Sequence, residues 1–317
     1  MSSTLLLYRG EEFNANFFYH SKVDFDHSFI LIQGKEKTLF VSGMNERVAR
    51  DEFEGEVVAY RDPVDTLCNY LKGRTVEIDG ANFSVRMADK LKRYCKLKDV
   101  TIKLLEMRAK KSKEEVAKIG KAVRITKEII HSIDFKKAKT EMDIRKQLFT
   151  QTFEMGLDRA FEPVISTDQN TSYPHYYCGH KKLGGLVMVD YGVRVGHYCS
   201  DVTRCFILDG DKKKKEQYEK LEDICHFVID SLPDLKKGKH VGELSNELLE
   251  KSGFPKLPHS TGHGVGLDIH ELPRLGLNSD DRIAGSVVAI EPAFYLKNYG
   301  MRFEETVDLT GKRARIL

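Results

Sequence analysis

Long hydrophobic runs are missing from this chain of 317 residues. No segment approaches the roughly 18 to 20 consecutive apolar residues that a membrane-spanning helix requires. The N-terminal stretch MSSTLLLYRGEEF has only a short apolar core and no leading positive charge, so we expect no signal peptide. These two absences predict a protein that stays in the cytoplasm and does not engage a membrane.

The chain also has little excess charge and few recognisable ligand motifs. Its formal net charge is +3, which is too small to indicate a nucleic-acid partner. The lysine run at residues 212–215 is typical of the exposed first turns of a helix. The six cysteines include no CxxC pair, which favours reduced thiols in a cytoplasmic chain. No GxGxxG or GxxxxGK[ST] motif occurs, so no phosphate-binding loop is predicted.

What is present is an ordinary globular composition, with 41% hydrophobic and 31% charged residues. The length suggests two domains, each large enough for its own core. Residues 1–105 alternate strand-like and helix-like segments, which predicts a small α/β domain. The predicted strands are FILIQG, TLFVSG, EVVAY and TVEIDG, and the predicted helices are MNERVARDEF and SVRMADKLKRYCK.

A change of pattern near residue 105 marks the start of a second domain, which we assign to residues 106–317. Apolar residues then recur at three- and four-residue steps and predict an amphipathic helix. Ser112 and Glu115 have the spacing of a capping box at its start. A second helix is predicted over residues 140–156, where a glycine ends it.

Helices and strands then follow one another in the same order twice. Strands are predicted in LVMVDYGV and CSDVTRCFIL, which form a hairpin-like pair. Helices follow over residues 212–231 and 241–252, and further strands in GVGLDIHE, SVVAIEPAFYL and MRFEETVDL. This order predicts a pseudo-duplicated α+β domain with helices on one face of an antiparallel sheet.

Two carboxylates lie inside these apolar runs. Asp190 interrupts GGLVMVDYGV and Glu291 interrupts SVVAIEPAFYL. An isolated ionised carboxylate is very costly to bury, so each must be protonated or compensated by positive charge. The hairpin would bring Asp201 close to Asp190, and a cation between them would relieve their repulsion. A simple ion pair between Asp201 and Arg204 is the alternative.

A histidine and a further glutamate complete the set. His263 lies in a glycine-rich segment, seven residues before His270. Glu304 lies in GMRFEETVDL beside Arg302 and Glu305, and an exposed acidic pair balanced by the arginine is the alternative there. Four carboxylates and one histidine form a hard ligand set that suits divalent ions such as Mn²⁺, Co²⁺ or Zn²⁺ and can hold two of them.

The spacing of these residues resembles that of a known family. The segments VDYGVRVGHYCSDVTR, HSTGHGVGLDIHELPR, AIEPAFY and GMRFEE are similar to the signature of the pita-bread metallopeptidases. This family includes methionine aminopeptidases, Xaa-Pro aminopeptidases and Xaa-Pro dipeptidases, also called prolidases. The resemblance covers residues 106–317 and implies a catalytic domain in which pseudo-duplicated helices lie on a curved antiparallel sheet.

The resemblance implies a role for each ligand. Asp190 would hold one metal ion, His263 and Glu291 would hold the other, and Asp201 and Glu304 would bridge both. Mn²⁺ and Co²⁺ are the favoured ions, with Zn²⁺ and Fe²⁺ as alternatives.

The resemblance also implies the chemistry. A water between the ions would be the nucleophile, and Glu291 would be the general base. His175, in TSYPHYYCG, matches a histidine near the substrate amide. His270 matches one that steadies the scissile carbonyl or its oxyanion. Arg274 resembles an arginine that clamps the C-terminal carboxylate of a dipeptide.

The N-terminal α/β domain favours the Xaa-Pro peptidases within this family, because simple methionine aminopeptidases generally lack it. The expected substrates are short peptides with proline at the second position, cleaved by a dipeptidase or an aminopeptidase. The alternatives are a methionine aminopeptidase, a creatinase-like amidinohydrolase and a non-catalytic binding module. The family resemblance also suggests a homodimer.

Overall fold

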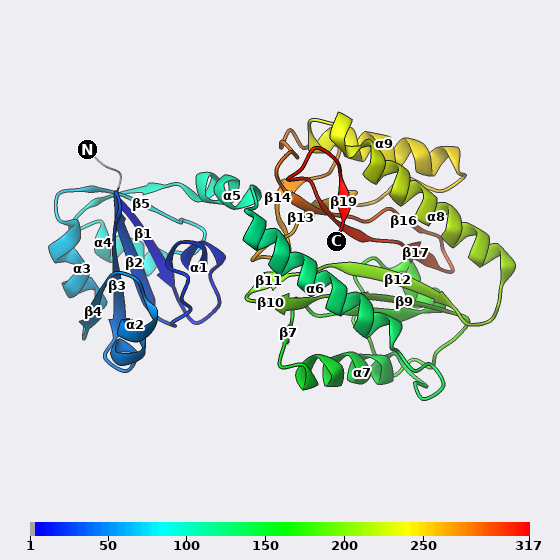
Figure 1. Cartoon of the computed structure of the whole chain (residues 1–317), viewed down its shortest axis with the longest axis horizontal. Coiled ribbons are helices and arrows are strands. Elements are labelled where there is room, and N and C mark those ends of the chain that lie inside the picture. Colours follow the sequence, from blue (N-terminus) through cyan, green and yellow to red (C-terminus); the bar gives the residue numbers. More distant parts are fainter. Residues whose placement is uncertain (1–3) are drawn as a thin grey trace. The chain divides into compact units, whose positions relative to one another are not determined.

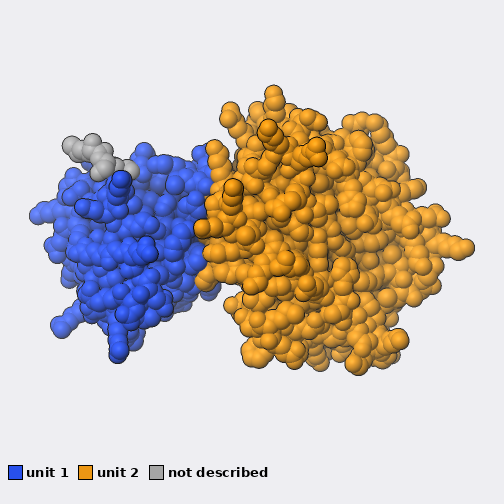
Figure 2. All heavy atoms as spheres, viewed as in Figure 1, with its two compact units in different colours: residues 1–107 blue, residues 108–317 orange. Residues whose placement is uncertain are grey.

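The computed structural model describes residues 4–317 and divides the chain after residue 107 (Figure 2). We call residues 1–107 the N-terminal unit and residues 108–317 the C-terminal unit. The predicted boundary near residue 105 falls in the helix α5 (Thr101–Ala109), which crosses this division.

The N-terminal unit is built on a six-stranded mixed sheet with the order β4-β3-β2-β1-β5-β6. Neighbouring residues such as Leu6 and Leu7 belong to different apolar clusters, because successive side chains of a strand point to opposite faces. Both faces of the sheet are therefore buried. The strands are β1 (Thr4–Arg9), β2 (Ser28–Gln33), β3 (Glu36–Ser42), β4 (Glu56–Tyr60), β5 (Thr75–Ile78) and β6 (Lys96–Asp99).

Four short helices accompany this sheet: α1 (Ala15–Ser21), α2 (Glu46–Glu52), α3 (Pro63–Leu71) and α4 (Val85–Leu91). The predicted strands and both predicted helices of this region are confirmed. The elements β1, α1, α3 and β6 were not predicted. A start signal for α1 is present in Asn14, whose side chain accepts the backbone N–H groups of Asn16 and Phe17.

The C-terminal unit begins with two capped helices, α6 (Lys113–His131) and α7 (Glu141–Glu154). The capping box of Ser112 and Glu115 is present as predicted, and Thr140 caps α7 in the same way. Gly156 takes a positive φ of 66° where the chain leaves α7. The apolar face of α6 is buried and packs on the strands β10 (Val193–Val195) and β11 (Tyr198–Cys199).

Two sets of antiparallel strands follow. The first set contains β7 (Asp158–Arg159), β8 (Val164–Thr167), β9 (Leu186–Tyr191), β10 (Val193–Val195), β11 (Tyr198–Cys199) and β12 (Val202–Ile207). The helices α8 (Lys212–Ser231) and α9 (Gly238–Lys251) come next and lie side by side (Figure 1). The second set contains β13 (Gly262–Gly264), β14 (Glu271–Arg274), β15 (Val287–Ile290), β16 (Ala293–Tyr295), β17 (Gly300–Arg302), β18 (Glu305–Asp308) and β19 (Arg315–Ile316). The predicted order, helices and then strands twice over, is confirmed.

Three predicted strands need correction. GVGLDIHE is not a strand, because residues 265–270 form a loop between β13 and β14. SVVAIEPAFYL is divided at Glu291 and Pro292, where proline lacks the N–H that a ladder requires. MRFEETVDL is divided at Phe303 and Glu304. In the last two cases the break coincides with a predicted metal ligand.

Two smaller expectations are confirmed. Asp211 caps α8, and Lys212, Lys213 and Lys215 are exposed in its first turns. All six cysteines are free thiols. Among residues 4–317, no helix has both the length and the apolar content needed to cross a membrane.

Candidate metal centre

One pocket of the C-terminal unit, with a volume of about 460 Å³, is lined by every residue predicted to act in catalysis, substrate binding or metal binding. The residues come from both sets of strands and from the loop that follows the 3₁₀ helix η1 (Asp168–Ser172). They are His175, Asp190, Asp201, His263, His270, Arg274, Glu291 and Glu304.

The two aspartates reach the pocket from one hairpin. Strands β9 and β12 pair in antiparallel fashion, with Asp190 opposite Thr203. Asp201 lies directly before β12, and the short strands β10 and β11 occupy the connection. The predicted hairpin-like pairing of these two stretches is therefore confirmed.

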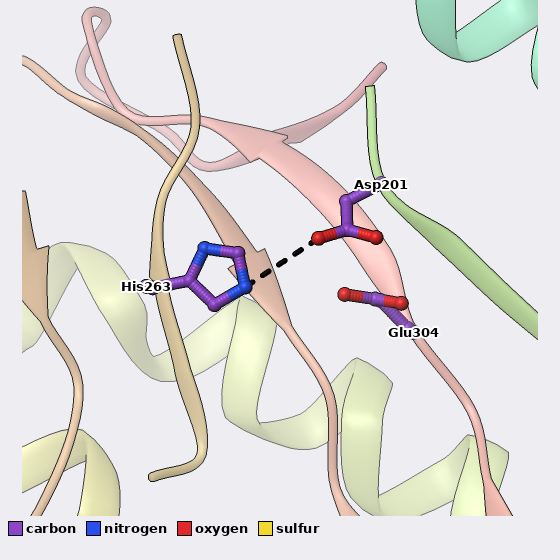
Figure 3. Close-up of side chains that lie close together, drawn as sticks. All are labelled: Asp201, His263 and Glu304. Carbon is purple, nitrogen blue, oxygen red and sulfur yellow. Dashed lines mark ion pairs between the residues drawn. The ribbon is translucent and has the colours of Figure 1, made fainter. Parts of the chain in front are cut away.

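Three predicted ligands form a tight group, which we call the ligand trio: Asp201, His263 and Glu304. Donor atoms from all three lie within 4.8 Å of one another. Nε2 of His263 lies 3.4 Å from Oδ2 of Asp201. Figure 3 shows the three side chains pointing toward one another from separate segments of the chain. The trio thus has the spacing of groups that share a cation.

Glu291 lies beside the ligand trio. Its Oε1 atom is 3.7 Å from Nε2 of His263. Its backbone N–H donates to the carbonyl of Thr261 at 2.8 Å, which fixes the point where β15 ends. The carboxylate is therefore held at the edge of the sheet, next to the histidine.

Asp190 stands apart from the ligand trio because an arginine holds it. Oδ2 of Asp190 accepts a hydrogen bond from Nη2 of Arg302 at 2.5 Å. Oδ1 is buried and has no hydrogen-bond partner in the described chain. One oxygen of this carboxylate is thus fixed by the protein, while the other remains free to meet a cation.

The structure excludes both simpler interpretations of the acidic residues, the Asp201–Arg204 ion pair and the exposed pair of Glu304 and Glu305. Glu304 and Glu305 are both buried, so they are no exposed pair. Glu305 contacts Lys127 at 2.6 Å and also pairs with Arg204. Arg204 is therefore engaged by Glu305 rather than by Asp201.

Burial and mutual repulsion shift the carboxyl groups toward their neutral forms. Burial raises the pKa of Asp201 well above its usual range, and the charges of Glu304, Asp190 and Glu291 raise it further. Burial, followed by the charges of Asp190 and Glu291, also raises the pKa of Glu304. Burial raises the pKa of Glu291 to about 7, against an opposing effect of Arg302.

The two histidines shift in the opposite direction. Burial, together with the neighbouring His270, lowers the pKa of His263 to about 3. Burial also lowers the pKa of His270. Their rings lie 4.3 Å apart in an edge-to-face arrangement. Both are therefore neutral imidazoles near pH 7, the form in which histidine binds metal.

These features fit divalent cations. The four candidate carboxylate ligands and one buried guanidinium, that of Arg302, line the same pocket, and Oδ1 of Asp190 has no hydrogen-bond donor among the described residues. Carboxylate oxygens and a neutral imidazole are donors that divalent ions accept. A bound cation would satisfy the free oxygen and remove the repulsion that raises the carboxyl pKa values.

The predicted substrate residues line the same pocket. His175 is carried by the loop after η1. Arg274 ends β14, and its side chain is 71% exposed. Nε of Arg274 lies 3.2 Å from Oδ2 of Asp281, so a carboxylate of the protein already engages part of the guanidinium.

A hydrogen-bonded group beside the ligands was not predicted; its members are Thr203, His259, Tyr295 and Arg302. Arg302 donates from Nε to Oγ1 of Thr203 at 2.9 Å, and Thr203 donates to Oε2 of Glu304 at 2.7 Å. Tyr295 OH lies 3.2 Å from Nη1 of Arg302 and 3.1 Å from Nε2 of His259. A sequence signal existed for two of them, since Thr203 and Arg302 each lie two positions from a predicted ligand and alternate residues share a face.

Comparisons with known proteins agree with this geometry. Residues 117–310 match metallopeptidase family M24. The chain is 29% identical over 306 residues to the Xaa-Pro dipeptidase of Pyrococcus furiosus, which covers 91% of this chain and 86% of that protein. The prolidase structure from the same organism superposes with a TM-score of 0.89 at 25% identity, covering 99% of this chain and 96% of that one.

The X-Pro aminopeptidase of Thermotoga maritima shares the fold, with a TM-score of 0.89 at 24% identity, covering 99% of this chain and 95% of that one. The predicted architecture, a pita-bread domain preceded by a smaller α/β domain, is confirmed. Because the family match spans well over half of the sequence and the candidate ligands lie within it, the chain belongs to metallopeptidase family M24, whose enzymes use divalent metal ions.

Proposed function

We propose that this chain is a dinuclear metal-dependent peptidase that hydrolyses the peptide bond before a proline at the second position of a short peptide. The observation that carries the proposal is the single pocket that unites the five candidate ligands with His175 and His270. The Xaa-Pro dipeptidase relative supports it, because its similarity extends over 91% of this chain.

That coverage favours an Xaa-Pro peptidase over a methionine aminopeptidase, since the match runs beyond the family's catalytic region at residues 117–310. A creatinase-like enzyme or a binding module would be expected to have lost ligands. All five positions here carry residues that can bind a metal ion.

The ligand roles follow the family pattern. Asp190 would bind one ion through its free Oδ1, and His263 and Glu291 would bind the other. Asp201 and Glu304 would contact both ions. Mn²⁺ or Co²⁺ suits this oxygen-rich set best, with Zn²⁺ and Fe²⁺ as alternatives. When bound, such ions polarise a carbonyl oxygen and lower the pKa of water.

The protein's own groups move the protons. Glu291 lies beside the ligand trio, so its carboxylate would be placed to accept a proton from the attacking water and return it to the leaving proline nitrogen. The carbon–nitrogen bond breaks as that nitrogen is protonated. His270 lines the same pocket and would donate a ring N–H group to the substrate carbonyl and its developing oxyanion. His175, which also lines the pocket, would lie near the substrate amide.

Arg274 would distinguish a dipeptide from a longer peptide. Only its Nε is engaged, by Asp281, and its two terminal nitrogens form no hydrogen bond within residues 4–317. A guanidinium at the pocket wall can bind the C-terminal carboxylate that only a dipeptide places next to proline.

Hydrolysis of Ala-Pro and Met-Pro with added Mn²⁺ or Co²⁺ tests the main proposal. Asp201→Asn should weaken metal binding and lower kcat/KM by on the order of 100-fold or more, because it removes a ligand. Asp209→Asn is the matched control, since Asp209 is a surface carboxylate paired with Lys214. Unchanged metal content and activity in Asp201→Asn would exclude the dinuclear site.

The role of Arg274 is tested by comparing Ala-Pro with Ala-Pro-Ala. We expect Arg274→Ala to raise KM for the dipeptide by roughly tenfold and to leave the tripeptide unaffected, because a contact made throughout the reaction is lost. If the wild-type protein turned over the tripeptide as well as the dipeptide, the carboxylate clamp would be rejected in favour of an aminopeptidase.

Two further proposals concern the whole protein. We propose a cytoplasmic location, which the six free thiols support. A homodimer is implied by the family resemblance, and light scattering of the purified protein would test it.

A further inference from the structure

Three charged side chains are buried together beside the pocket without lining it. Lys111 Nζ lies 2.9 Å from Oε2 of Glu271, and both side chains are only 1% exposed. Nη1 of Arg108 lies 3.5 Å from Oε1 of Glu271, and Arg108 is 3% exposed. None of the three has a role in the proposed reaction.

The side chain of Glu271 binds the loop Val265–His270, which connects β13 to β14. Oε1 of Glu271 accepts the backbone N–H of Asp268 at 3.0 Å. A Cβ atom placed on Gly266 would lie 2.5 Å from Oε2 of Glu271, so only glycine leaves room for the carboxylate. The carboxylate thus fills the inside of the loop and fixes its backbone.

The same loop is held from outside at two more points. Nη2 of Arg108 donates to Oδ2 of Asp268 at 2.8 Å. The backbone N–H of Cys199, on β11, donates to the carbonyl of Gly266 at 2.7 Å. Residues 108–111 and strand β11 therefore hold the loop against the rest of the C-terminal unit.

His270 is the last residue of this loop and precedes Glu271 directly. Its ring lies 4.3 Å from that of His263, a member of the ligand trio. A shift of the loop backbone would therefore move His270 relative to the metal ligand. Small displacements of a catalytic group have large effects on rate.

Stability alone does not account for the burial of these three charged side chains. Desolvation makes such clusters expensive, and well-packed apolar replacements are often neutral or stabilising. We propose that Glu271 and Lys111 are positioning residues, whose ion pair fixes the loop Val265–His270 and thereby sets His270 in the pocket. The part played by His270 rests on the proposed function, whereas the fixing of the loop does not.

Hydrogen exchange tests the loop without reference to activity. Glu271→Gln keeps the shape but loses the charge, and Lys111→Met keeps the length of the apolar stem. We expect both variants to exchange amide hydrogens faster over residues 265–270, by on the order of tenfold, while α6 and α8 keep their protection. Asp308→Asn is the matched control, because Asp308 is a buried carboxylate that pairs with Arg315 away from the pocket.

Kinetics on the folded, metal-loaded variants separates positioning from simple stabilisation. For hydrolysis of Ala-Pro, kcat should fall on the order of 10- to 100-fold with little change in KM or metal content. Lys111→Arg, which keeps the charge, should restore most of the loss seen in Lys111→Met. The double variant Lys111→Met with Glu271→Gln should lose less than the product of the single effects, because the two act as a pair.

The outcomes distinguish this proposal from the proposed function. Unchanged exchange over residues 265–270 in both variants would overturn the positioning role, whatever the enzyme hydrolyses. Faster exchange with kcat within about twofold of wild type would also overturn it, because the loop would then be fixed for stability only. A wild-type protein inactive on Xaa-Pro peptides would contradict the proposed function. The hydrogen-exchange result would still decide whether Glu271 and Lys111 fix the loop.

Discussion

At the scale of single residues, surroundings decide what each acidic group can do. Glu305 is buried against two cations, Lys127 and Arg204. Its neighbour Glu304 forms no ion pair with a lysine or arginine among the described residues, and other carboxylates surround it. The protein itself therefore balances Glu305, whereas Glu304 depends on a proton or on a cation from outside.

Glu291, another buried carboxyl group of the site, predicts a change of the stability of the metal-free protein with pH. The pKa of Glu291 is raised from 4.5 to about 7, so the folded state holds a proton that the unfolded state has lost between those values. The contribution of Glu291 to the free energy of unfolding should therefore fall as pH rises through this window, by roughly 3 kcal/mol in total.

Urea unfolding in the presence of a chelator, from about pH 5 to about pH 8, measures the effect. The difference in unfolding free energy between the wild type and Glu291→Gln isolates this contribution, because the amide does not titrate and His263, whose pKa is lowered, acts in both proteins. A difference that stayed constant over this range would show that the carboxylate of Glu291 is compensated within the protein.

At the scale of elements, the N-terminus of α7 organises the loop that carries His175. Glu141, the first residue of α7, is fully buried. One of its oxygens accepts from Thr167 and Asn170, and the other accepts from Tyr176 and Gly179, at 2.9–3.1 Å. Four donors on one carboxylate fix the start of η1 and the segment just after His175.

Glu141→Gln should loosen that segment. Whichever way the new amide turns, its NH₂ group faces a backbone N–H donor, of Thr167 or of Gly179, so we expect a loss of roughly 1–3 kcal/mol in unfolding free energy. KM for Ala-Pro should rise because His175 is less well placed. Urea unfolding and steady-state kinetics measure the two effects. Glu154→Gln, at the exposed end of the same helix, is the control and should match the wild type in both.

At the scale of the whole molecule, every residue assigned to the reaction lies in the C-terminal unit. Its buried ion cluster of Lys111, Glu271 and Arg108 also lies within residues 108–317. The residues proposed to bind metal ions therefore all belong to one unit, which has its own apolar core.

A chain of residues 100–317 should accordingly unfold cooperatively and bind Mn²⁺ with an affinity within roughly threefold of the full chain. Starting at residue 100 keeps α5 intact. Circular dichroism and calorimetric titration provide the measurements. Loss of cooperative unfolding, or metal binding weakened by more than about tenfold, would show that the N-terminal unit is needed to form the centre.

One error in predicting the elements has its cause in a distant residue. GVGLDIHE has the apolar character of a strand, yet it forms a loop because Glu271 and Arg108 bind its backbone and Asp268. Arg108 is far from these residues in the sequence. Local patterns report the preferences of neighbouring residues, and they carry no record of a distant partner that overrides those preferences.

The sequence by itself determined the helices with clear caps, the paired strands β9 and β12, and the set of candidate ligands. Asp190 and Glu291 were visible because a charge inside an apolar run conflicts with burial unless something compensates it, and the family resemblance identified the other ligands. Only the tertiary structure decided that Asp201, His263 and Glu304 form the tight group, that Arg302 holds Asp190, and that Lys111 holds Glu271. These contacts join residues far apart in the chain, and electrostatic interactions depend on distance in space and on burial rather than on separation in sequence.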